Sequence, residues 1–517
     1  MIHGDRRSFL SGLLGVAAFS ATGMGRAATI GLPLEAADRL ASDPRRPQYH
    51  FLPAANWMND PNAPIYFSGK FHLFYQYNPN AAVWGDMHWG HAISTDMVHW
   101  KHFPVALAPT ADGPDADGCF SGTAAVQDGQ VVILYTAVHS ASEDLATIKD
   151  GPRSMKESQC LATTSDPELK TWSKLAAPII QNPPAGMQVN GFRDPSPWRQ
   201  GDWWYMVVGT GIANEGGAVL LYRSKDLRGW EFMHILAGRN RTGLKSTDAF
   251  DPWEVWECPE FFSLGGKHVL IYSTLGRVYW QSGELDPATM KFHAERSGVV
   301  DYGSFYAAKT QLDTAGNRII WGWVPETRPV EEYKAAGWAG MMSLPRVLTL
   351  SADGRLKSSI AAEVRALRGR EQRIGLAGDE DEKQRQIQAL RIEGCSGEIL
   401  CKLRRTKEPF QLALQSADGS ATWLRLKYDP HYPDQVSLDS RPVPVVLAEG
   451  ETLDLHLYVD GSVIEVLANQ QQAWTRRFYP VGPHSQDMRL QWTGKAASIE
   501  SLTVWQISPI SADRLTT

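Results

Sequence analysis

Short apolar runs separated by polar turns dominate the chain between residues 50 and 345. One unit recurs five times there: a strand-like run, a turn that ends in Gly, and a second apolar run. The turns end at Gly69, Gly129, Gly201, Gly266 and Gly316. Val, Ile, Tyr, Phe and Trp fill the runs, as half-buried strands require. Because no long 3.6-residue period interrupts them, the pattern predicts strands rather than helices.

The spacing of the five glycines predicts how these strands assemble. Successive turns lie 50 to 72 residues apart, and a repeat of several tens of residues is typical of propeller blades. A second marker, a polar turn that is closed by a Trp, recurs late in three units, at Trp100, Trp172 and Trp230. Five such units of about four strands each form a five-bladed β-propeller. A β-sandwich or barrel would leave the matching glycines as a coincidence.

The rest of the chain divides into segments by its pattern of apolar runs and turns. We expect a linker at 29–48, the propeller at 49–345, and a connector with a short helix (359–367) at 346–372. From 373 to 517, shorter strand-like runs alternate with turns such as Asp429-Pro430 and Asp460-Gly461. Short strands at this spacing predict a C-terminal β-sandwich, so the expected fold class is all-β.

The first 28 residues predict an export signal. Arg6 and Arg7 stand directly before Ser8-Phe9-Leu10, and a weakly apolar stretch with many small residues runs on to Ala28. This combination is typical of a twin-arginine signal that is cleaved near its end. We therefore expect a periplasmic or secreted protein.

Composition narrows the classes of partner. The net charge of −6 gives no reason to expect nucleic acid, because phosphate binding needs clustered Lys and Arg. No apolar run after the N-terminus is long enough to span a membrane. The five cysteines are an odd number without regular spacing, so no disulfide framework is expected. A bridge between Cys395 and Cys401 stays open.

Three acidic residues occupy stiff, aromatic-rich turns at one phase of the repeat. Asp60, Asp194 and Glu257 precede the Gly of their units by 9, 7 and 9 residues. The first strand of each propeller blade lines the central channel, so we expect these three carboxylates around one pocket. Crowded like charges separate their pKa values, which would leave one carboxyl protonated near neutral pH. An acid/base and a nucleophile need such an arrangement, although each Asp-Pro pair alone is an ordinary turn former.

Two other patterns resemble metal sites, but we expect neither a metal nor any cofactor. His88 with His91, and His99 with His102, have helix-like ligand spacing in a strand-rich region, where hydrogen-bonded loop residues are commoner. The stretch 112–118 holds three Asp residues but lacks the alternation and closing Glu of a calcium loop. We interpret it as a solvated loop.

Several motifs together resemble glycoside hydrolase family 32, the invertases, levanases and inulinases. The matching segments are Trp57-Met58-Asn59-Asp60-Pro61-Asn62, Phe120-Ser121-Gly122, Phe192-Arg193-Asp194-Pro195, Trp256-Glu257-Cys258-Pro259, Trp338-Ala339-Gly340 and Leu344-Pro345-Arg346. The stretch 459–466 resembles a motif of the family's sandwich. The chain departs from the family pattern at Ala63, where Gly is commoner, and at Gly461, where a basic residue is commoner.

The resemblance implies a five-bladed propeller followed by a β-sandwich, and it implies roles for the acids. Asp60 would attack the anomeric carbon of a fructosyl unit, Glu257 would protonate the leaving oxygen and then activate water, and Asp194 would stabilise the transition state. Retaining glycosidases hold two carboxyl groups about 5–5.5 Å apart for this chemistry. Arg193 would keep Asp194 ionised or bind a hydroxyl. The remaining residues implied for the fructose subsite are Asn59, Gln76, Trp84, Phe120 and Ser121.

The expected function is an exported retaining β-fructofuranosidase that acts on terminal β-D-fructosyl residues of sucrose or fructans. A fructosyltransferase would use the same site, and Asn62 beside the nucleophile favours hydrolysis by family resemblance. A furanosidase for arabinose or xylose linkages would not carry the Trp57 to Asn62 motif. A non-catalytic sugar-binding propeller would be expected to have lost one of the three acids. The sequence does not rank sucrose, levan and inulin, and leaves endo or exo action and oligomeric state open.

Overall fold

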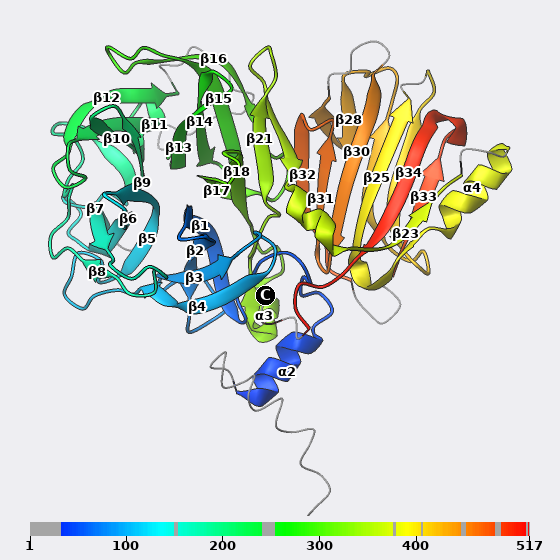
Figure 1. The fold of residues 1–517 in the computed structure, drawn as a ribbon, viewed down its shortest axis with the longest axis horizontal. Coiled ribbons are helices and arrows are strands. Elements are labelled where there is room, and N and C mark those ends of the chain that lie inside the picture. Colours follow the sequence, from blue (N-terminus) through cyan, green and yellow to red (C-terminus); the bar gives the residue numbers. More distant parts are fainter. Residues whose placement is uncertain are drawn as a thin grey trace, which may run out of the picture.

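The computed structural model describes residues 33–148, 154–239, 254–375, 379–404, 407–445, 451–480, 487–512 and 515. The expected export signal lies outside these residues. Strands make up most of the described chain, as Figure 1 shows, and the prediction of an all-β fold is confirmed. The α-helices in this part are α2 (Leu34–Ser42), α3 (Val330–Ala336) and α4 (Glu380–Ala389). No helix among the described residues is long and apolar enough to cross a membrane.

Five antiparallel sheets follow one another along the first part of the chain. Their strands are β1 (Asn56–Phe67), β2 (Lys70–Asn78), β3 (His88–Ser94) and β4 (Trp100–Leu107); β5 (Gly118–Gln127), β6 (Gln130–Ser140), β7 (Met155–Thr163) and β8 (Ser173–Lys174); β9 (Val189–Gln200), β10 (Trp203–Ile212), β11 (Gly216–Ser224) and β12 (Glu231–Gly238); β13 (Glu257–Leu264), β14 (Lys267–Thr274), β15 (Arg277–Leu285) and β16 (Phe292–Val299); β17 (Tyr306–Leu312), β18 (Arg318–Val324), β21 (Arg346–Leu350) and β22 (Leu356–Ile360). Each sheet is one blade.

The two repeated sequence markers have direct structural causes. Each repeat glycine lies in the turn between the first two strands of its blade, at a φ between 60° and 84° that residues with a Cβ rarely adopt. The indole N–H groups of Trp100, Trp172 and Trp230 each donate to the carbonyl three residues earlier, at 2.8 to 3.1 Å. These bonds close the turn before the fourth strand of the blade. The markers therefore report one hairpin and one turn per blade.

The blades close into a ring. The innermost strand β1 contacts β5 on one side and β17 of the last blade on the other. After β18 the chain returns to the first blade, where β19 (Trp338–Ala339) pairs in parallel with β1, and then β20 (Met341–Met342) pairs with β18. Gly340 joins the two short strands, and a Cβ there would lie 2.0 Å from the Met58 carbonyl oxygen. The segment therefore fastens the fifth blade to the first.

The expected connector was wrong in part, because it includes strands of the fifth blade. The linker region contains α2, whose Leu40 is buried in the first-blade core. The region 346–372 contains β21 and β22, which complete the fifth blade, so the propeller extends to Ile360. Only the 3-10 helix Ala362–Leu367 separates it from the next domain. The sequence signal was weak because these outer strands are short and carry no repeat marker.

Two six-stranded sheets form the C-terminal β-sandwich, as predicted. Their orders are β23 (Arg368–Arg373), β34 (Ile499–Ile507), β25 (Ser396–Arg404), β30 (Thr452–Asp460), β31 (Val463–Ala468), β32 (Gln472–Arg477), and β24 (Arg391–Ile392), β33 (Met488–Thr493), β26 (Phe410–Ser416), β27 (Thr422–Tyr428), β28 (Gln435–Leu438), β29 (Arg441–Pro444). Cys401 is a free thiol in the core between them, so no bridge to Cys395 is formed.

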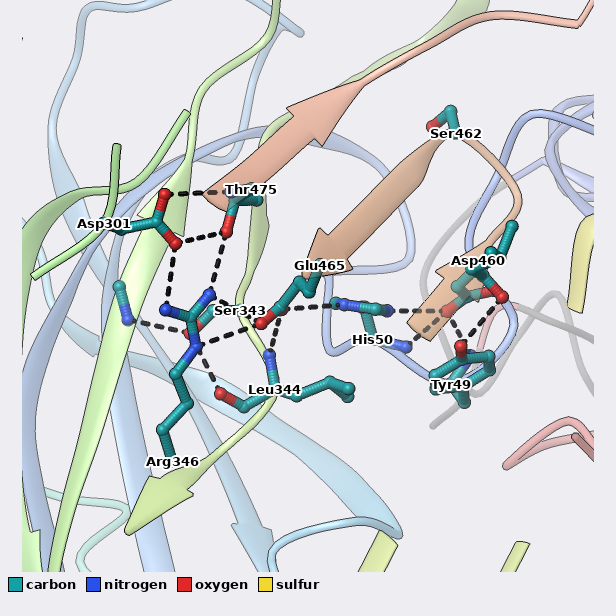
Figure 2. A network of polar contacts seen from close by, with 12 residues as sticks. Tyr49, His50, Asp301, Ser343, Leu344, Arg346, Asp460, Ser462, Glu465 and Thr475 are labelled. Carbon is teal, nitrogen blue, oxygen red and sulfur yellow. Dashed lines mark hydrogen bonds and ion pairs between the residues drawn. The ribbon is translucent and has the colours of Figure 1, made fainter. Parts of the chain in front are cut away.

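A buried polar network joins the two domains (Figure 2). Arg346 of the last blade donates to Glu465 of the sandwich at 2.6 and 3.0 Å and to Asp301 at 2.9 Å. His50, from the segment that enters the first blade, lies 2.9 Å from Asp460 and 3.0 Å from Glu465. All five side chains are fully buried. Residues from three separate parts of the chain are thereby fixed to one another.

Gly461, where the chain departs from the family motif, lies at the same interface between the domains. Gly461 has a φ of 57°, and a Cβ at this position would lie 2.8 Å from the carbonyl oxygen of Arg46. The backbone N–H groups of Gln48, Tyr49 and His50 donate to the Asp460 carboxylate. The N-terminal segment therefore passes so close to the sandwich turn that a side chain at 461 would displace it.

Candidate active site

A cavity of about 780 Å³ lies where the five innermost strands meet. Each of these strands contributes lining residues, among them Asp60 of β1, Ser121 of β5, Asp194 of β9, Glu257 of β13 and Tyr306 of β17. The nine residues predicted to form the site all line this one cavity; they are Asn59, Asp60, Gln76, Trp84, Phe120, Ser121, Arg193, Asp194 and Glu257. The expectation that the three acids would face one pocket is therefore met by their positions.

A β-bulge in every innermost strand directs these side chains into the cavity. At 58–61, 120–122, 193–196, 257–260 and 306–309 the innermost strand carries one more residue than the strand beside it. Asp194, Cys258 and Ala307 adopt positive φ values of 65°, 49° and 52° within their bulges. Bulges bend a strand and re-aim its side chains, and a Pro is tolerated there because it lacks an N–H. The Asp-Pro and Cys-Pro pairs are thus the sequence signature of the bulges.

Asp60 is held by three neighbours. Ser121 Oγ donates to Asp60 Oδ2 at 2.7 Å, Asn59 Nδ2 donates to Oδ1 at 3.0 Å, and the Cys258 thiol approaches Oδ2 at 3.5 Å. The indole N–H of Trp57 in turn fixes the Asn59 amide at 2.8 Å. Burial raises the pKa of Asp60, and the hydrogen bonds from Ser121 and Asn59 oppose the rise. The carboxylate is therefore oriented by donors that favour its charged form.

Asp194 is a buried acid of the cavity with a raised pKa. Its Oδ2 accepts the backbone N–H of Cys258 at 2.7 Å, and its own N–H donates to Thr136 at 2.8 Å. Burial raises the pKa of Asp194 to about 7, while Arg193 lowers it and Glu257 raises it. Crowding of like charges was expected to be the main cause of such a shift, but burial is the larger one.

Glu257 accepts hydrogen bonds from residues of two other blades. Arg193 Nε of the third blade donates to Oε1 at 3.1 Å, and Tyr306 Oη of the fifth donates to Oε2 at 2.5 Å. Arg193 also forms an ion pair of 2.5 Å with the fully buried Glu157. The hydrogen bonds of Arg193 go to these two glutamates. Its charge still lowers the pKa of Asp194.

The remaining predicted residues surround the acids. Gln76 donates to the Cys119 carbonyl at 2.9 Å, which holds its amide at the cavity wall. Trp84 is 57% exposed at the cavity and meets the Phe120 ring edge-on, with ring centroids 6.0 Å apart. An exposed aromatic face beside carboxylates is a typical sugar-binding surface. Asn62 is fully buried in the first blade.

Comparison with known proteins settles the family. The model for the Glycosyl hydrolases family 32 N-terminal domain matches residues 50–359, and the model for the family's C-terminal domain matches residues 363–506. The chain belongs to glycosyl hydrolase family 32. It is a glycosidase with the propeller and sandwich of that family.

Individual relatives agree over nearly the whole length. The chain is 34% identical to the sucrose-6-phosphate hydrolase of Escherichia coli, over 89% of this chain and 94% of the relative, and 34% identical to the raffinose invertase of the same species, over 89% and 95%. Among solved structures, the Bombyx mori family 32 beta-fructofuranosidase superposes with a TM-score of 0.73 at 27% identity, covering 95% of this chain and 99% of that chain. The fructan 1-exohydrolase IIa of Cichorium intybus gives 0.73 at 25%, covering 90% and 98%.

Sequence reasoning missed several residues of the glycosidase site. Tyr306, Trp323, Met87 and Cys258 also line the cavity. Tyr306 precedes its repeat glycine by 10 residues, close to the phase of the three acids. A search for any polar residue, and not only for an acid, at this distance before the repeat glycine would have found Tyr306.

The two patterns that resembled metal sites have other causes. His91 is fully buried and lies 3.0 Å from His72, whereas His99 bonds Asp96 at the surface. The stretch 112–118 is not a solvated loop throughout, because Asp115 is buried in an ion pair with Lys174 and accepts a hydrogen bond from Tyr135. Among the residues that the structure describes, no group of three or more His, Cys, Asp or Glu is placed to hold a metal.

Proposed function

We propose that this family 32 enzyme hydrolyses terminal β-D-fructofuranosyl bonds of sucrose or fructans with retention of configuration. The observation that carries the proposal is the meeting of Asp60, Asp194 and Glu257, from three different blades, at one cavity with an aromatic rim. The Bombyx mori and Cichorium intybus relatives, solved with sucrose and with 1-kestose respectively, support the substrate class.

The first step assigns roles to two acids. An Asp60 oxygen attacks C2 of the fructosyl unit, while Glu257 gives its proton to the glycosidic oxygen. The C2–oxygen bond to the leaving sugar breaks and a C2–Asp60 ester forms. Ser121 and Asn59 orient Asp60 for the attack. Tyr306 and Arg193 hold Glu257 at the leaving group.

The second step reverses the role of Glu257. As a carboxylate it takes a proton from water, the water oxygen bonds to C2, and the ester to Asp60 breaks. Two inversions at C2 leave the released fructose in the β configuration. Asp194 accepts hydroxyl hydrogen bonds and stabilises the positive charge that develops at C2, which requires its ionised form.

We also propose that the enzyme is exported. The support is the paired Arg6 and Arg7 before Ser8-Phe9-Leu10 and the small residues up to Ala28. Fusion of residues 1–28 to a reporter that works only outside the cytoplasm tests this. Export that is lost when Arg6 and Arg7 become Lys supports the twin-arginine route, and unchanged export of the Lys variant would contradict it.

Product analysis tests the reaction itself. The enzyme is incubated separately with sucrose, levan and inulin, and the first fructose released is followed by NMR before it mutarotates. The expected result is β-fructose from at least one of the three. Initial release of the α-anomer would contradict the covalent route, and binding of these sugars without release of any product would favour a sugar-binding propeller.

A further inference from the structure

A second polar cluster lies on the innermost strands, two to four residues beyond the residues that line the catalytic cavity. It contains one charged pair, Glu260 of β13 and Lys309 of β17, with Thr123 of β5, Ser196 of β9 and Thr310 of β17 around it. We call these five residues the axial cluster, because four of the five innermost strands contribute to it. All of them are buried, and Lys309 has no exposed surface.

Hydrogen bonds surround the ion pair. Lys309 Nζ lies 3.2 Å from Glu260 Oε1 and donates to Thr123 Oγ1 at 3.2 Å. Ser196 donates to the same Glu260 oxygen at 2.8 Å, and Thr310 donates to Oε2 through its N–H at 3.1 Å and its hydroxyl at 2.8 Å. A buried ion pair seldom stabilises a fold more than apolar side chains of similar volume. Filling the ring of strands therefore does not by itself explain two charges here.

The register of the strands places the cluster one layer below the reacting groups. Ser196 follows Asp194 by two residues, and Glu260 and Lys309 follow Glu257 and Tyr306 by three. Each pair spans the bulge of its strand. Burial opposes the charge of Lys309, but Glu260, Cys258 and Asp194 outweigh burial and raise its pKa, so the lysine remains a cation.

We propose that Lys309 is a positioning residue that keeps Asp194 a carboxylate, and that Glu260 sets how much of the lysine's charge reaches the site. The inference rests on the proposed function only in taking the cavity as the sugar site. The charged groups that act on Asp194 are Arg193, Lys309, Glu257 and Asp60. Arg193 is shared between Glu157 and Glu257. Lys309 bonds Glu260, which follows Cys258 by two residues on β13, and the Cys258 N–H donates to Asp194. Arg318 of β18 lies 3.4 Å from the Thr310 hydroxyl and acts on Glu260.

The ionised form of Asp194 matters because it binds sugar more strongly. A carboxylate accepts charge-assisted hydrogen bonds from hydroxyl groups, which are about twice as strong as neutral ones. Protonation turns one oxygen into a donor and removes this advantage. Sugar affinity should therefore fall as pH falls through the pKa of Asp194.

The test measures sucrose affinity against pH in the full-length Glu257→Gln protein, in which turnover of sucrose is expected to be slower by about two to four orders of magnitude and the Glu257 carboxyl no longer acts on Asp194. Adding Lys309→Met should move the pH midpoint of binding upward by about one unit, since a nearby opposite charge shifts a carboxyl pKa by one to three units. Adding Glu260→Gln should move it downward, because the lysine's charge is then uncompensated. Thr310→Val, which removes a hydrogen bond to Glu260 but no charge, is the matched control and should leave the midpoint in place.

Opposite shifts of the pH midpoint in the two charge variants support the inference, because the loss of a purely structural contact would not move the midpoint in opposite directions. If Lys309→Met alone fails to fold, the double variant Lys309→Met with Glu260→Gln keeps a neutral pair of similar shape, and its midpoint should still lie above that of the parent. Binding with a midpoint that stays fixed in folded charge variants overturns the inference alone. If sucrose is not bound, the same measurement is made with levan and with inulin. Absence of binding of all three sugars at every pH overturns the proposed function and this inference with it.

Discussion

Tyr306 Oη donates a hydrogen bond of 2.5 Å to Glu257 Oε2, across the boundary between the fifth and fourth blades. Arg193 occupies the other oxygen from the third blade. Glu257 is thus oriented by groups from both neighbouring blades before any substrate arrives. Such pre-organisation lowers the activation free energy, because Glu257 does not have to be oriented during the reaction.

Loss of the tyrosine hydroxyl should therefore slow the chemistry. We predict that Tyr306→Phe lowers kcat on sucrose about tenfold, with little change in KM. This is less than the roughly 10²–10⁴-fold that a general acid–base group itself contributes, because Arg193 still holds Glu257. Steady-state kinetics on the folded variant gives the answer. An unchanged kcat would show that Arg193 alone holds Glu257.

The assignment of Glu257 as acid/base predicts a dependence on the leaving group. Glu257→Gln should lose activity on sucrose by about two to four orders of magnitude, because the departing sugar needs a proton. An activated aryl fructoside leaves without that proton, so its first step should suffer less, and azide should restore part of the second step. Equal losses on both substrates without a response to azide would assign Glu257 another role.

Water and sugar compete for the same covalent intermediate, so the product ratio reports how well an acceptor is held. We expect glucose and fructose in nearly equal amounts at low sucrose, with transfer products only at high sucrose. Chromatography across a wide range of sucrose concentrations tests this. Glucose in large excess over fructose at low sucrose, with the difference found in oligosaccharides, would make the enzyme a fructosyltransferase.

The domain interface predicts how stability changes with pH. Burial opposes the charge of His50, but Asp460 and Glu465 outweigh it and raise its pKa from 6.5 to about 9. A raised pKa in the folded state means that the protonated imidazole stabilises the fold fully below pH 6.5 and that this contribution is lost as pH rises through 9. The raised pKa of Asp194 affects stability at lower pH, between the ordinary pKa of an aspartate and about 7.

Chemical denaturation at pH 6.5 and at pH 9.5 should therefore show a clear loss of stability at the higher pH. His50→Gln should flatten this difference, whereas His431→Gln, at an exposed position, should leave it as it is. If stability changes equally with pH in the parent and in His50→Gln, His50 does not cause the pH dependence.

Much of the fold followed from the sequence because its signals are local. A hairpin turn that requires positive φ selects Gly, and the five turns recur once per blade. The acids were predictable for the same reason, since the bulges that aim them leave a Pro directly after Asp60 and Asp194 and two residues after Glu257. The outer strands β21 and β22 and the helix α2 were missed because none carries a repeat marker.

Partners that depend on three-dimensional register could not be predicted. Sequence adjacency associated Arg193 with Asp194, but the bulge sends the guanidinium to Glu257 and Glu157. The pairing of Glu260 with Lys309 joins residues 49 positions apart, and nothing in either local sequence marks it. The interface of His50, Arg346 and Glu465 likewise exists only after both domains have formed.

The most direct test of the central claim is to find the covalent bond. The Glu257→Gln protein is mixed with an activated fructoside, quenched rapidly, digested and examined by mass spectrometry. The predicted result is one added fructosyl group on the peptide that contains Asp60, and its loss when Asp60→Asn is combined with Glu257→Gln. Release of the activated leaving group with the fructosyl group on a different peptide, or equal labelling of the double variant, would contradict the assignment of Asp60 as the nucleophile.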